Sequence, residues 1–206
     1  LDRVVYSNPA PLLTLTMAAA VSRRVRLMTG VLISPFRNAT LLAKEVATLD
    51  TFSRGRVTLG LGVGIREDDF RATGAPTMHT RGKQIEEQIK EMRRVWSGKP
   101  LGKHIDPIGP TPVQSNGPEI ILGGVVPTAL QRAARFADGI ITALNDLGQI
   151  DQSFRLVAQA WQEEGRSGKP RLLAQIDIGL ETAHDDRAVD TLMAYYKAMP
   201  PYDTYK

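Results

Sequence analysis

Two glycine-rich segments at the ends of predicted strands are the residues of this sequence best suited to contact a ligand. The first, Gly60-Leu61-Gly62-Val63-Gly64, follows an apolar segment, as the phosphate-binding loop of a dinucleotide fold does. That fingerprint, G-x-G-x-x-G, requires a third glycine at position 65, where this chain has Ile65. We therefore expect close backbone approach at this strand end, either for packing alone or to admit a flat ligand.

The second glycine pair, Gly123-Gly124, lies between an apolar segment and a helix predicted to begin at Pro127. Backbone N–H groups at a helix N-terminus attract anions, and glycine lets a phosphate approach the backbone. Phosphate sites in barrel enzymes commonly form on late loops of this kind. The pair therefore predicts either a phosphate site or a plain tight turn.

Acidic residues and histidines do not form a metal-binding pattern. The adjacent carboxylates of Glu67-Asp68-Asp69 cannot all face one ion. No two histidines are spaced for a zinc helix, and the chain has no cysteine, which excludes thiolate-ligated zinc and a thiol nucleophile. We expect no bound metal.

Composition limits the class of protein. The 206 residues are 42% hydrophobic and 23% charged, which is ordinary for a globular chain. The net charge of +4 comes without a basic block, so we predict no nucleic-acid binding. No apolar run approaches the length of a membrane span and the start does not resemble a signal peptide, so we expect no membrane association and a cytoplasmic location.

Apolar segments alternate with amphipathic ones along the chain. Strands are predicted at residues 25–33, 56–62, 119–124, 139–144 and 172–180. Helices are predicted at 8–21, with Asn8 as the cap, and at 41–52, with Leu42, Val46, Leu49 and Phe52 facing inward. Further helices are predicted at 81–96, 127–137, 150–164 and 186–199, and residues 100–118 as a loop. Such alternation predicts a parallel sheet covered by helices, which fits either a doubly wound sheet or part of a (β/α)8 barrel.

Several short motifs together resemble the bacterial luciferase-like monooxygenase superfamily over about residues 25–141. The motifs, in order, are Leu42-Ala43-Lys44-Glu45, Thr48-Leu49-Asp50, Ser53-Arg54-Gly55-Arg56, Leu59-Gly60-Leu61-Gly62, Ala72-Thr73-Gly74, Arg81-Gly82, Ile121-Leu122-Gly123-Gly124, Arg132-Ala133-Ala134-Arg135 and Ala137-Asp138-Gly139. The resemblance implies an α/β fold of the (β/α)8 TIM-barrel type, with residues 1–206 forming one domain. It also implies an incomplete barrel, in which the first strand and helix precede Leu1 and the last follow Lys206.

The resemblance implies a cofactor site at the C-terminal mouth of the barrel, where members bind reduced FMN or the deazaflavin coenzyme F-420. In relatives a bulge with a cis non-proline peptide supports the ring system, and the matching residues are Gly30 and Val31. Asp68 matches a polar position that approaches the ring edge. The backbone site near the phosphate or ribityl chain matches Ile121, Leu122, Gly123 and Gly124.

The implied function is a flavin-dependent oxidoreductase acting on a small organic substrate. Reduced FMN would be used with oxygen, or F-420 for hydride transfer, and a homodimer is possible. Ile65 stands where some deazaflavin members carry a proton-transferring acid, so we name no catalytic residue. Two alternatives remain: a non-catalytic flavin-binding relative, and a phosphate-binding TIM-barrel lyase or isomerase.

Overall fold

A computed structural model of the chain describes residues 2–75, 77–144, 146–176 and 190. Residue contacts divide the chain into two units, Leu1–Ala174 and Gln175–Lys206, and every helix and strand given below belongs to the first. The predicted helix 186–199 and the end of the predicted strand 172–180 lie outside the described residues.

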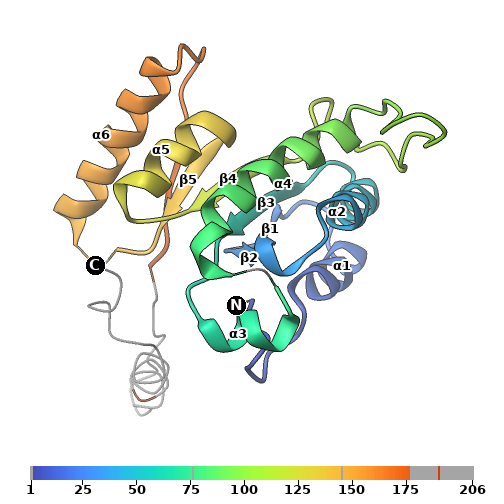
Figure 1. Cartoon of the computed structure of the whole chain (residues 1–206), viewed down its shortest axis with the longest axis horizontal. Helices are drawn as coiled ribbons and strands as arrows, with labels where there is room; N and C mark the ends of the chain where they lie inside the picture. Colours follow the sequence, from blue (N-terminus) through green and yellow to red (C-terminus); the bar gives the residue numbers. More distant parts are fainter. Residues whose placement is uncertain (1, 76, 145, 177–189, 191–206) are drawn as a thin grey trace. The chain divides into compact units, whose positions relative to one another are not determined.

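Six parallel strands form one sheet in the first unit. They are β1 (Leu27–Met28), β2 (Leu32–Ile33), β3 (Val57–Gly62), β4 (Glu119–Gly123), β5 (Gly139–Thr142) and β6 (Arg171–Ala174). The order is β1-β3-β4-β5-β6, and β2 also pairs with β3. The sheet curls into a half-barrel, and helices connect successive strands from β2 onward (Figure 1). This confirms the predicted α/β class and the partial TIM-barrel architecture.

The helices follow the predicted pattern closely. They are α1 (Pro11–Val21), α2 (Ala39–Ser53), α3 (Glu67–Thr73), α4 (Arg81–Trp96), α5 (Pro127–Phe136) and α6 (Leu147–Glu163), with 3-10 turns at Ser34–Phe36 and Met78–Thr80. Local chemistry sets several of their ends. The side chain of Asn38 accepts a hydrogen bond from Leu41 N at the start of α2, and Arg54 ends that helix in the left-handed conformation.

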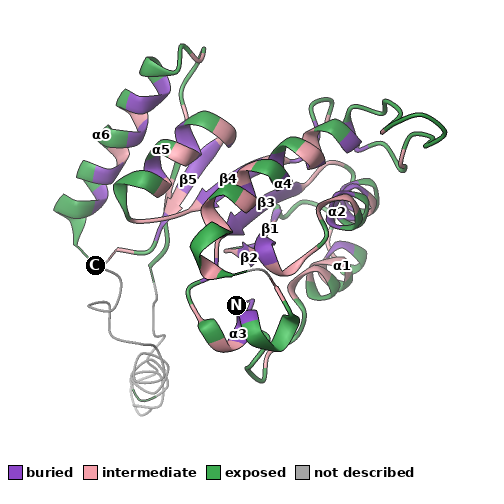
Figure 2. Cartoon of the chain, viewed as in Figure 1, coloured by how far each residue is buried: buried purple, intermediate pink, exposed green. Residues whose placement is uncertain are grey.

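The core lies between the sheet and its helices (Figure 2). From β3, Val57, Leu59 and Leu61 are fully or almost fully buried in it. The predicted inward residues of α4 pack in the same cluster, among them Ile85 and Met92. This layer gives the carboxyl ends of the strands a rigid base.

Two local predictions were wrong, and one helix was not predicted. Helix α1 begins at Pro11 rather than near Asn8, and its cap residue is Ala10. Phe52, expected to face inward, is 63% exposed, because it lies on the far side of the last turn of α2. Helix α3 was not predicted, although its acidic first turn and the left-handed Gly74 at its end are ordinary helix signals.

Candidate functional site

The strand register gives the sheet two chemically different faces. Since alternate residues of a strand point to opposite faces, the core residues Leu59 and Leu61 place Gly60 and Gly62 on the concave face. Gly60 is in register with Ile121 of β4, and Gly123 follows two residues later on the same face. The concave face near the carboxyl ends of β3 and β4 is therefore lined largely by glycine.

A bulge interrupts the strand that was predicted at residues 25–33. Met28 pairs with Thr58 and Leu32 pairs with Leu61, so three intervening residues lie opposite two on β3. The peptide bond between Gly30 and Val31 is cis, as the resemblance implied. Thr29 holds the bulge to β3 by a hydrogen bond of 2.7 Å from its hydroxyl to the Gly60 carbonyl oxygen.

The concave glycines make room for this bulge. A Cβ atom on Gly60 would collide with the carbonyl oxygen of Thr29. A Cβ on Gly62 would lie 2.7 Å from Val31 Cγ2, and one on Gly123 would lie 3.1 Å from Val31 Cγ1. The side chain of Val31 therefore lies across two strands, in a space that Gly62 must leave open and that Gly123 borders closely. Of the two roles considered for the first glycine run, close packing is confirmed.

The pair Gly123-Gly124 is also used for packing. The N–H of Gly124 donates to the Ile141 carbonyl oxygen over 3.1 Å, so it is not free to bind an anion. A Cβ on Gly124 would lie 2.5 Å from the Cβ of Ala129, so this glycine lets α5 approach the sheet. Helix α5 itself begins after Val126, with no side-chain cap on its first N–H groups.

The side chains of Ile121 and Leu122, the two residues before Gly123-Gly124, point to opposite faces of the sheet. Ile121 lies on the concave face, in register with Gly60, and is fully buried. Leu122 lies in the core cluster beneath the helices, which leaves only its backbone for contact with a ligand at the concave face.

Asp68 lies in the first turn of α3, beyond the end of β3. Its carboxylate accepts hydrogen bonds from Arg66, at 3.1 and 2.7 Å, and from the N–H of Asp69. The hydrogen bond from Arg66 is the main reason that the pKa of Asp68 lies below its usual value, with a smaller effect from Arg3. Asp68 is therefore a charged, arginine-paired carboxylate near neutral pH, and not a proton donor.

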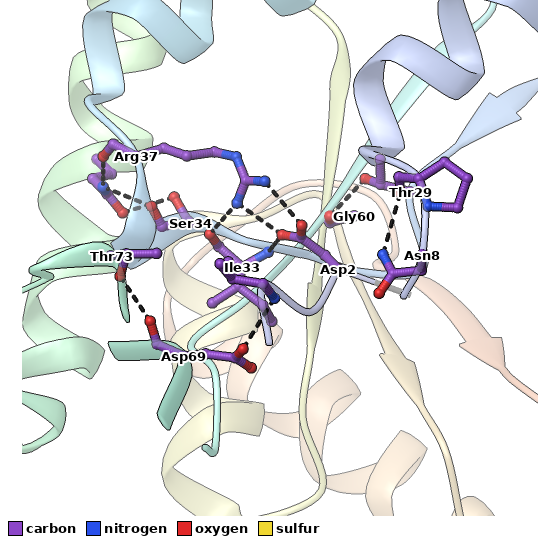
Figure 3. Close-up of polar contacts among 12 residues, drawn as sticks. Asp2, Asn8, Thr29, Ile33, Ser34, Arg37, Gly60, Asp69 and Thr73 are labelled. Carbon is purple, nitrogen blue, oxygen red and sulfur yellow. Dashed lines mark hydrogen bonds and ion pairs between the residues drawn. The ribbon is translucent and has the colours of Figure 1, made fainter. Parts of the chain in front are cut away.

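Two buried carboxylates that sequence reasoning missed tie the N-terminal segment to this region (Figure 3). Asp2 is 7% exposed and accepts a hydrogen bond of 2.6 Å from the Ile33 N–H and two from Arg37, at 2.7 and 2.9 Å. Asp69 is 3% exposed and accepts hydrogen bonds from the N–H groups of Val4 and Val5, at 3.0 and 2.7 Å. We call residues 2–5 the N-terminal strap.

Three small or apolar residues near the carboxyl ends of the strands are only partly buried. Val31, Gly123 and Ile141 are each half-buried, so a partly open apolar surface remains where β4 and β5 end, beside the bulge that precedes β2. Among the described residues, no group of three or more His, Cys, Asp or Glu could hold a metal ion. Within the same part of the chain, no helix has the length and apolar character to cross a bilayer.

Comparison with known proteins finds one family model that covers almost the whole chain. The model, described as luciferase-like monooxygenase, matches residues 3–206. An uncharacterized protein of Mycobacterium tuberculosis is 33% identical over 172 residues, which cover 80% of this chain and 60% of that protein. The FMNH(2)-dependent dimethylsulfone monooxygenase of Pseudomonas putida is 27% identical over 179 residues, covering 82% of this chain and 49% of that enzyme.

Solved structures share the fold. The monooxygenase RslO1 from Streptomyces bottropensis superposes with a TM-score of 0.78 at 25% identity, covering 93% of this chain and 61% of that one. The coenzyme F420 dependent tetrahydromethanopterin reductase from Methanopyrus kandleri gives a TM-score of 0.69 at 22% identity, over 81% of this chain and 53% of that one. The chain thus spans about half to three fifths of the length of these proteins.

Proposed function

The chain belongs to the luciferase-like monooxygenase family, and from this premise we propose that it is an oxidoreductase that binds a reduced flavin at the carboxyl ends of its strands. The flavin is FMN or the deazaflavin F-420, and the second reactant is a small organic molecule. The observation that carries the proposal is the seat of Val31 on Gly62 and Gly123, which presents a half-buried apolar surface at the end of the sheet.

The residues of this chain would hold and shield the cofactor. Val31, Gly123 and Ile141 would contact the ring system, since they form the partly open apolar surface. The phosphate would lie near the N-terminus of α5, where the helix dipole favours an anion and Val126 supplies no side-chain cap, although the Ala129 N–H already donates to the Val126 carbonyl oxygen. Bound there, a reduced flavin would supply electrons, either to oxygen or as hydride to the substrate.

Relatives support both cofactors. The similar dimethylsulfone monooxygenase is named as FMNH(2)-dependent, whereas the similar tetrahydromethanopterin reductase is named as coenzyme F420 dependent. Asp68 does not favour either, since its carboxylate is held by Arg66. The proposal therefore includes both, and the choice between them is experimental.

The test is a fluorescence titration of the complete protein with FMN and with F-420, each oxidised and reduced. Binding of FMN alone assigns oxygen chemistry, and binding of F-420 alone assigns hydride transfer. Binding of neither, by a protein shown to be folded by circular dichroism, refutes the proposal. Binding without turnover of any substrate identifies a non-catalytic relative.

A matched pair of variants locates the site. Val31→Ala removes two methyl groups from the proposed ring surface, and we expect it to weaken cofactor binding by about fivefold to twentyfold. Val21→Ala makes the same chemical change on the exposed end of α1, where Val21 is 87% exposed, and should leave affinity unchanged. Equal affinities for both variants would place the cofactor elsewhere.

A further inference from the structure

The N-terminal strap is held by two buried carboxylates that act on different parts of the molecule (Figure 3). Asp69 reaches from α3 to the strap itself, where it accepts from Val4 and Val5 N–H. Asp2 reaches from the strap to the sheet, where it accepts from Ile33 N–H. The two aspartates have nearly the same burial, so they differ mainly in what they hold.

Ile33 is held at both of its backbone polar groups. Its N–H donates to Asp2, and its carbonyl oxygen accepts a hydrogen bond of 2.7 Å from Arg37 Nη1. The same Nη1 atom donates to Asp2 Oδ2, also at 2.7 Å, so Asp2, Arg37 and Ile33 form a closed ring of hydrogen bonds. A bidentate arginine–carboxylate pair of this kind fixes orientation as well as position.

This ring lies two residues from the bulge. Ile33 is in register with Gly62, the glycine on which Val31 rests. Beyond Asp2 and Arg37, Ser34 and the Arg37 carbonyl are bound by the buried Gln88 side chain of α4. The segment after the bulge is therefore anchored to the core, and Asp2 supplies the charged part of the anchor.

From this geometry we infer that Asp2 is a positioning residue for the cofactor site. Through Ile33 and Arg37 it holds β2 so that the Val31 side chain stays seated on Gly62 and Gly123 and presents its surface to the ring. The inference rests on the proposed function. Loss of the carboxylate leaves the Arg37 guanidinium without its buried partner, which is destabilising, and removes the charged acceptor of the Ile33 N–H.

The test compares Asp2→Asn with Asp69→Asn. Each variant exchanges one buried strap carboxylate for an amide of nearly the same size. We expect both to lower the midpoint of thermal unfolding. Only Asp2→Asn should weaken binding of FMN or F-420, whichever the wild type binds, by about tenfold to a hundredfold. Only Asp2→Asn should also change the visible circular dichroism of the bound cofactor, which reports how the ring lies in its site.

The outcomes separate the inference from the proposed function. A wild-type protein that binds no flavin refutes both. A wild type that binds, with Asp2→Asn unchanged in affinity and spectrum, refutes only the inference. Equal losses of affinity in both aspartate variants would mean that the strap acts as a whole, and would also refute it.

A second variant guards against misfolding of Asp2→Asn. Arg37→Lys keeps the buried charge pair but gives up the bidentate geometry and the bond to the Ile33 carbonyl. We expect it to fold and to change cofactor affinity and spectrum in the same direction as Asp2→Asn, but less. A folded Arg37→Lys protein with the wild-type spectrum and affinity would contradict the inference.

Discussion

The packing of Val31 against Gly62 can be tested with one substitution, Gly62→Ala, made in two backgrounds. We expect it to lower the stability of the wild type but not that of the Val31→Ala protein. Gly62→Ala places a Cβ 2.7 Å from Val31 Cγ2, about 0.7 Å closer than ordinary van der Waals contact. Val31 is β-branched and sits in the bulge, so it cannot easily turn away. Overpacking of this kind costs about 1–3 kcal/mol. For a chain of this length that corresponds to a fall of about 2–12 °C in the unfolding midpoint.

Removing the two Val31 methyl groups should abolish the conflict. The Cβ of Val31 would lie 3.7 Å from the new Cβ on Gly62, which is ordinary contact. In the Val31→Ala background, Gly62→Ala should then be neutral or should stabilise the protein by about 0.4–1 kcal/mol, since alanine restricts the unfolded chain. The same substitution is therefore expected to destabilise one protein and not the other.

The assay is a double-mutant cycle in which unfolding by urea is monitored by circular dichroism. The four proteins are the wild type, the two single variants and the double variant. Gly102→Ala is the control, because a Cβ there meets only Ile105 Cδ1, at 3.7 Å. If Gly62→Ala changes the free energy of unfolding equally in both backgrounds, to within about 0.5 kcal/mol, the packing argument is wrong.

Two further predictions concern carboxylates away from that seat. Asp50 is fully buried and accepts hydrogen bonds from the Val113 and Gln114 N–H groups. Asp50→Asn should therefore lower the free energy of unfolding, measured by urea denaturation, by about 1–3 kcal/mol. A change below about 0.5 kcal/mol would contradict this prediction. The pKa of Asp68 is lowered mainly by its hydrogen bond with Arg66. This pairing therefore stabilises the fold at any pH above the usual aspartate pKa of about 3.9. The stabilisation is lost as the pH falls through the lowered pKa of the folded state. The difference in stability between wild type and Asp68→Asn should therefore shrink below that pH, and a difference that stays constant would show that the pair is not formed.

Periodic features of this chain were predictable from sequence because the cause of each is local. The amphipathic pattern of α4 put Ile85, Ile89 and Met92 on one face, and all three are buried. Arg54-Gly55 marked the end of α2, where Arg54 takes the left-handed conformation. Such signals depend only on residues that are close in sequence, so they predict the helix without knowledge of the tertiary contacts.

The parts that sequence did not predict depend on distant contacts. Residues 25–33 have the composition of one continuous strand. The bulge at Val31 is explained by Gly62 of β3 and Gly123 of β4, which make room for its side chain. Asp2 finds Ile33 across 31 positions, and Asp69 finds Val5 across 64, so no spacing rule could pair them. Gly123-Gly124 was correctly expected at a strand end, but its use in packing Ala129 required the helix to be placed.

The N-terminal strap also has a consequence for how the chain is made. Within the strap, Val4 and Val5 precede their partner Asp69 by 65 and 64 positions. At a synthesis rate of about 5–20 residues per second, the strap is made roughly 3–13 s before that carboxylate exists. During this interval the N–H groups of Val4 and Val5 have no aspartate to bind. Docking of the strap onto α3 must therefore wait until Asp69 has been made, and we expect it to follow assembly of β1, β2 and β3.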